Sequence, residues 1–123
     1  MKVLLNKCYG GYSFSEDFVK HLIYNDIVPD YTNYFNLQRH DQRVVEEAIK
    51  FGLDNASGIC GQLEIREIPD GANYSISEYD GMESIDNIWI DVSIHDLKYG
   101  LKQNQLQMVM KGCNVKPIKL NEL

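Results

Sequence analysis

The sequence predicts an α+β fold: an antiparallel sheet of about four strands, with two to three helices packed on one face. Three observations lead to this class. Short segments alternate apolar and polar residues, other segments repeat apolar residues at helical spacing, and the last three strand patterns follow one another without a helix between them. The chain has 123 residues, so we expect a single domain over 1–123, with 113–123 as a tail or an edge strand.

The first elements are a buried strand over 2–6, a turn at 7–11 with paired glycines, and a helix that ends near Asp26. Ser13 and Glu16 have the spacing of a capping box, which predicts that the helix begins there. Its apolar face is predicted to contain Phe14, Phe18, Leu22 and Ile23.

Pro and Asn residues interrupt any period from 27 to 38, which predicts an irregular loop with a short extended piece at 34–37. Asp41 is then expected to cap a second helix that Gly58 terminates. Its apolar face is predicted to contain Val45, Ala48, Ile49 and Leu53.

Strand patterns follow over 62–68, 73–79 and 87–92. The turn residues 69–71 predict that the first two of these strands form a hairpin, and Asp80-Gly81 is a second turn signal. Ser93 and Asp96 then predict a final helix that carries Ile94, Leu97, Leu101 and Met108. Gly100 weakens that helix by about 1 kcal/mol relative to Ala.

The chain is acidic, with 12 basic and 18 acidic residues, a formal charge of -6 and a pI near 4.9. This balance argues against binding to long nucleic acid but allows a small anionic ligand. Residues 70–96 hold seven acids and no Lys or Arg, whereas 97–123 hold five lysines and one acid. Such polarity suits self-association as a homodimer or higher homo-oligomer, and it equally fits two solvated faces of opposite charge.

Three widely spaced cysteines without a CxxC pair suggest neither a disulfide framework nor a zinc site, which fits a reducing cytoplasm. No apolar run approaches the length that spans a bilayer, so we expect no membrane partner and no secretion. The three histidines form no metal-binding motif, and no cofactor is predicted.

Two arrangements of residues could support catalysis. Cys8 with a histidine could form a nucleophilic pair, but a Cys directly after a strand is more often a buried hydrophobe. A group of acidic residues could hold a divalent ion, but solvated turn acids explain it better. This group is Glu78, Asp80, Glu83 and Asp86.

The glycine loop is more informative, because a strand there passes through Gly10-Gly11 directly into a helix whose first N–H groups can receive a phosphate. Tyr9, Tyr12 and Phe14 offer stacking faces, and Arg39 and Arg43 are two of only three arginines. The alternatives are a plain turn, Phe14 in the helix core, and Arg43 paired with Glu46 or Glu47.

Three segments, 5–15, 37–47 and 67–83, resemble a small phage and prophage family, that of the first Thoeris anti-defence protein. The resemblance covers roughly residues 1 to 88 and implies an oligomeric sponge in the host bacterial cytoplasm. Such a sponge sequesters a cyclic ADP-ribose-type nucleotide, and in some relatives cyclic trinucleotides, without cleaving it. This chain continues to Leu123, whereas relatives end soon after the Tyr-Asp-Gly segment, so no ligand residue is carried over to its C-terminal part.

The resemblance and the glycine loop together give the expected ligand-binding residues. These are Gly10 and Gly11 for phosphate approach, Tyr12 and Phe14 for stacking, Arg39 for phosphate charge, and Tyr79 and Asp80 for ribose or base contacts. No catalytic residue is expected, so the predicted protein is not an enzyme. Two alternatives remain: an acidic phage protein that inhibits a host protein through residues 70–96, and an enzyme that degrades the signal.

Overall fold

The computed structural model describes residues 1–31 and 33–118, and it confirms the predicted α+β class. Its strands form two sheets: a two-stranded antiparallel sheet of β1 and β2, and a three-stranded mixed sheet in the order β3-β4-β5. The strands thus do not join in the one antiparallel sheet that the sequence predicts.

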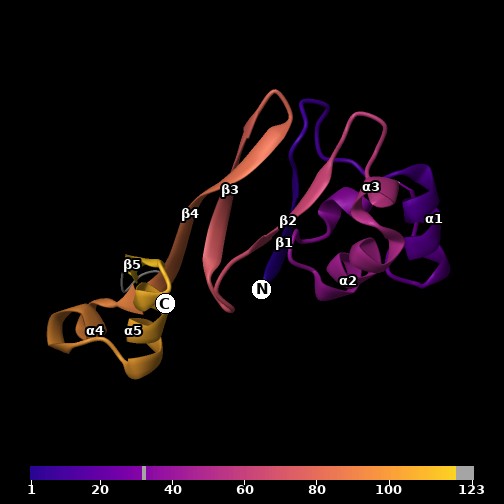
Figure 1. The fold of residues 1–123 in the computed structure, drawn as a ribbon. Coiled ribbons are helices and arrows are strands. Elements are labelled where there is room, and N and C mark those ends of the chain that lie inside the picture. The colour runs from indigo at the N-terminus through magenta and orange to yellow at the C-terminus, as the bar shows by residue number, and fades with distance from the viewer. Residues whose placement is uncertain (32, 119–123) are drawn as a thin grey trace. The chain divides into compact units, whose positions relative to one another are not determined.

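The chain divides into two compact units, and the single domain over 1–123 stays a prediction. Unit 1 comprises Met1–Glu67 and Ser77–Ser84, and unit 2 comprises Ile68–Ile76 and the chain from Ile85 onward. Figure 1 shows the elements of both units in chain colours.

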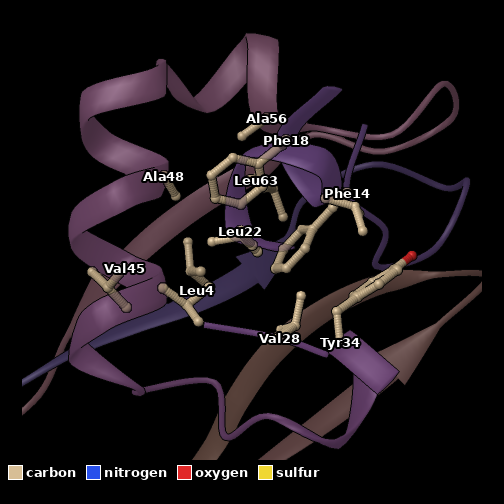
Figure 2. Packing of buried hydrophobic residues seen from close by; sticks show 12 residues of the cluster. Leu4, Phe14, Phe18, Leu22, Val28, Tyr34, Val45, Ala48, Ala56 and Leu63 are labelled. Carbon is tan, nitrogen blue, oxygen red and sulfur yellow. The ribbon is translucent and has the colours of Figure 1, made fainter. Parts of the chain in front are cut away.

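Unit 1 contains the antiparallel pair β1 (Lys2–Asn6) and β2 (Leu63–Glu67), in which Lys2 lies opposite Glu67 and Asn6 opposite Leu63. Three helices gather beside this pair (Figure 1): α1 (Glu16–Tyr24), α2 (Gln42–Phe51) and α3 (Leu53–Ala56). Their apolar faces meet in one core, shown in Figure 2, that contains Leu4, Phe14, Phe18, Val19, Leu22, Val28, Tyr34, Val44, Val45, Ala48, Ala56 and Leu63.

Helix α1 begins later than predicted, because Ser15 rather than Ser13 caps it. The Ser15 hydroxyl accepts a hydrogen bond from the N–H of Phe18 at 3.2 Å. Ser13 cannot begin the helix because its segment is extended: Ser15 N–H donates to the carbonyl of Ala56, and Gly58 N–H donates to that of Ser13.

Asp41 caps α2, as predicted, and its carboxylate accepts from the N–H of Arg43 at 3.1 Å. The helix ends at Gly52, whose φ of 91° is unfavourable for other residues, so Leu53 belongs to the separate helix α3. The extended piece predicted at 34–37 is instead a 3₁₀ helix, η1 (Asn33–Asn36).

The predicted hairpin between 62–68 and 73–79 is wrong. β2 pairs with β1, whereas β3 (Asn73–Tyr79) pairs with β4 (Met82–Ser93) through the two-residue turn Asp80-Gly81. Both turn residues have positive φ, 51° and 90°, which matches the right-handed twist of a tight hairpin. The tip of this hairpin, Ser77–Ser84, belongs to unit 1.

Unit 2 contains the remainder of the hairpin, helices α4 (Ile94–Tyr99) and α5 (Gln103–Met110), and β5 (Asn114–Ile118). Gly100, with φ 124°, divides the predicted final helix into α4 and α5. The two helices form the long connection that a parallel pair needs, and β5 runs parallel to β4. The predicted edge strand is therefore confirmed as far as Ile118, and residues 119–123 of that prediction lie outside the described residues.

Candidate functional site

The candidate site lies in unit 1, where the glycine loop (Lys7–Tyr12) follows β1. Asn6, at the end of β1, is fully buried. Its amide nitrogen donates to the carbonyls of Cys8 and Gly81, at 2.6 Å each, and its side-chain oxygen accepts from Gln62 N–H at 2.8 Å. One buried side chain therefore fixes the glycine loop, the start of β2 and the hairpin tip to one another.

Two glycines allow these segments to approach closely. A Cβ at Gly10 would overlap the carbonyl group of Cys60, and a Cβ at Gly81 would overlap the backbone nitrogen of Gly11 and lie 2.7 Å from the carbonyl oxygen of Tyr9. Gly11 differs, since its φ is 93° and a Cβ there would meet no atom within 4 Å. Of the two glycines expected to receive phosphate, Gly10 is packed against Cys60, and Gly11 leaves open space.

Arg39 forms a bidentate ion pair with Glu83, with nitrogen to oxygen distances of 2.6 and 2.8 Å. The Glu83 carboxylate also accepts from the N–H of Asn6 at 2.9 Å and is largely buried. The guanidinium carbon of Arg39 lies 3.5 Å from the centre of the Tyr12 ring. The charge that was expected to meet phosphate is therefore matched by a buried carboxylate, and one face of Tyr12 is covered.

Phe14 does not lie in the candidate site. It is 7% exposed, its ring stacks on Tyr34 with centres 4.8 Å apart, and Figure 2 shows it inside the core. Near the candidate site, the rings of Tyr9 and Tyr79 are 65% and 75% exposed. These rings belong to the glycine loop and the hairpin tip.

A cavity of about 210 Å³ lies at the hairpin tip and is lined by Lys7 and by residues 77–79 and 82–84. The Lys7 ammonium donates to the backbone carbonyl of Glu83 at 2.9 Å. The hydroxyls of Ser77 and Ser84 lie 2.9 Å apart across the hairpin. Sequence reasoning missed Lys7, Ser77 and Ser84, because only strand pairing brings them together.

Three of the four acids that were considered as an ion site have separate partners. Glu83 pairs with Arg39, the Glu78 carboxylate accepts from the N–H of Gly81, and Asp86 accepts from the Ser75 hydroxyl at 2.5 Å. Asp80 occupies the turn with φ 51°. Among residues 1–31 and 33–118, no group of three or more His, Cys, Asp or Glu side chains is arranged to hold a metal ion.

Two carboxyl groups of α2 and its cap have lowered pKa values. The pKa of Asp41 is lowered chiefly by a hydrogen bond from the Arg43 side chain, which pairs with Asp41 and not with Glu46 or Glu47. The pKa of Glu47 is lowered chiefly by its hydrogen bond with His21, at 2.7 Å. Side-chain hydrogen bonds at the surface thus account for both shifts.

Six of the seven expected residues therefore belong to the glycine loop, the segment before α2 and the hairpin tip, and Phe14 belongs to the core. Within the part of the chain that the structure describes, no helix is long and apolar enough to cross a membrane. Comparisons with protein-family models, curated proteins and solved structures found no match for this chain.

Proposed function

We propose that the chain is a phage-encoded sponge that binds a cyclic ADP-ribose-type signalling nucleotide and sequesters it without cleaving it, thereby inhibiting Thoeris immunity. In this proposal the protein acts in the host bacterial cytoplasm as a homodimer or higher homo-oligomer. It requires no cofactor and no catalytic group.

The observation that carries the proposal is a convergence in unit 1. The three segments of the family resemblance are far apart in the sequence, yet Asn6 from the first and Arg39 from the second both bond to Glu83, which ends the third. A shared bonded network gives a physical reason for these segments to occur together.

The surface beside this network supports the step to nucleotide binding. Two exposed tyrosine rings, Tyr9 and Tyr79, offer stacking faces to a base, and Lys7 supplies a cation at the same end of unit 1. Gly11 leaves room for close approach to the backbone. A ligand that combines adenine with phosphates can use all three features.

Isothermal titration of the purified protein with a glycocyclic ADP-ribose tests the proposal, with linear ADP-ribose as the matched control. After titration the protein is denatured, and the released nucleotide is identified by chromatography. We expect tight binding of the cyclic form and full recovery of intact ligand.

Each other result has a distinct meaning. Recovery of a cleaved nucleotide would replace the sponge with the signal-degrading enzyme. No binding at micromolar concentrations of this ligand or of cyclic trinucleotides would contradict the proposal. Capture of a basic host protein with an affinity that falls steeply with salt would then favour the acidic inhibitor.

A further inference from the structure

The cavity at the hairpin tip combines a cation, paired hydroxyls and an exposed aromatic ring. We propose that it binds one phosphoryl group of the ligand, with Lys7 supplying the charge, the Ser77 and Ser84 hydroxyls a hydrogen bond, and Tyr79 a stacking face for the adjoining ring. This inference rests on the proposed function, and it assigns the anion to different residues from Arg39 and Gly10.

Charge favours Lys7 over Arg39. The Arg39 guanidinium already donates two hydrogen bonds to the Glu83 carboxylate. A phosphate would therefore have to compete with this buried anion for the guanidinium. Lys7 donates instead to the uncharged backbone carbonyl of Glu83, and no ion pair of Lys7 occurs among residues 1–31 and 33–118. An ammonium has three donors, so Lys7 keeps its charge and two N–H groups for a ligand.

The serine pair supplies a further donor. With their oxygens 2.9 Å apart, one hydroxyl donates to the other, and the second hydroxyl hydrogen is left for another acceptor. Both residues flank the turn that Gly81 holds against the glycine loop. The donor therefore has a fixed position relative to Lys7.

Size indicates which part of the ligand the cavity accepts. Its volume of about 210 Å³ is below the roughly 300–1,000 Å³ of pockets that enclose whole drug-sized ligands. It therefore suits one phosphoryl group with the start of its sugar. The rest of the ligand lies outside it, where Tyr79 is 75% exposed and available for stacking.

One wall of the cavity opposes an anion. The Glu78 carboxylate lines it while accepting from the N–H of Gly81. Its negative charge partly offsets that of Lys7 and so weakens phosphate binding. Glu78→Gln keeps an oxygen that can accept from Gly81 and removes the charge, so it must strengthen binding if an anion occupies the cavity.

The test compares variants with opposite expected effects, using glycocyclic ADP-ribose and inorganic pyrophosphate as two separate probes. Lys7→Met should weaken binding of both by about 10- to 100-fold, the loss of a charge-assisted hydrogen bond, and Lys7→Arg should restore most of it. Glu78→Gln should tighten binding by roughly two- to fivefold. Lys20→Met and Glu64→Gln, which make the same charge changes at exposed positions of α1 and β2, should leave the affinity unchanged.

The results separate this inference from the proposed function. If the nucleotide binds and Lys7→Met and Glu78→Gln both match the wild type, the cavity assignment is overturned while the sponge survives. Lys7-dependent binding of pyrophosphate without binding of any cyclic nucleotide supports the anion site and contradicts the sponge. If neither probe binds the wild type, both are wrong. Because Lys7→Met also removes a hydrogen bond to Glu83, its unfolding is measured alongside, and Glu78→Gln remains decisive if that variant does not fold.

Discussion

Arg39 and Glu83 together close the edge of β1 that β2 leaves unpaired, and the Arg39 guanidinium donates to the backbone carbonyl of Leu4 at 3.3 Å. Leu4 N–H donates to the backbone carbonyl of Arg39 at 2.8 Å, and Asn6 N–H donates to the Glu83 carboxylate at 2.9 Å. The two side chains bond to each other at 2.6 and 2.8 Å. The two residues thus satisfy backbone N–H groups of β1 that would otherwise need the carbonyl groups of a third strand.

Replacing Glu83 by Gln should therefore destabilise unit 1. The change leaves the charge of Arg39 uncompensated where its side chain is only 24% exposed, so we expect a loss of about 3 kcal/mol in the free energy of unfolding. Urea unfolding measures it, and Arg39→Met combined with Glu83→Gln should lose less than the sum of the two single changes. A loss below about 0.5 kcal/mol for Glu83→Gln would show that the pair contributes little.

Gly81→Ala should be more harmful than Gly11→Ala, although both residues have φ near 90°. Each change places a side chain in the left-handed region, at a cost of roughly 1–2 kcal/mol. Only at Gly81 does the new Cβ also overlap the glycine loop. Thermal unfolding of both variants checks this, and equal losses would mean that the hairpin tip is not held against the loop.

The hydrogen bond between His21 and Glu47 should give stability that is lost in acid. Because folding lowers the pKa of Glu47 below its usual 4.5, its contribution is fully present above that value and disappears as the pH falls through the folded pKa. Glu47→Gln should lower the melting temperature at pH 7 and reduce its further decline between pH 5 and pH 3. Glu64→Gln is the control, and identical pH profiles for wild type and Glu47→Gln would contradict the prediction.

Phe14→Leu should affect stability and not ligand binding. Phe14 packs in the core against Tyr34 and Phe18, so a smaller apolar residue should cost about 1 kcal/mol while leaving the affinity for the cyclic nucleotide unchanged. Tyr79→Ala should do the reverse, because that ring is 75% exposed. Tyr24→Ala, on α1, is the exposed control. Weaker binding by Phe14→Leu at unchanged stability would contradict this prediction and indicate that Phe14 contacts the ligand.

Local chemistry made several elements predictable. A short apolar run identified β1, and alternation identified β2, β3 and part of β4. Asp41 was recognisable as a cap, and Asp80-Gly81 as a turn. Each depends on neighbouring residues and backbone conformation alone. Helix α1 was misplaced by two residues because pairing of its leading segment with 56–58, which is not local, excluded Ser13 as the cap.

Strand partners and side-chain partners were not predictable in the same way. A turn at 69–71 does not reveal that β2 pairs with β1, and the spacing of Glu83 among other acids does not reveal that it alone is buried against Arg39. The cavity was equally unpredictable, because about 70 residues of chain separate Lys7 from Ser77 and Ser84 at the hairpin tip.

The sequence by itself determined the α+β class, most element positions and the residue types available for binding an anionic ligand, because these follow from periodicity, capping and composition. Only the tertiary structure decided the division into two units and the contact of Lys7 with the hairpin tip. It also decided that Arg39 pairs with Glu83 and that Phe14 is buried in the core. The physical reason is that burial and ion pairing depend on which distant segments meet, and close approach at Gly10 and Gly81 sets that meeting here.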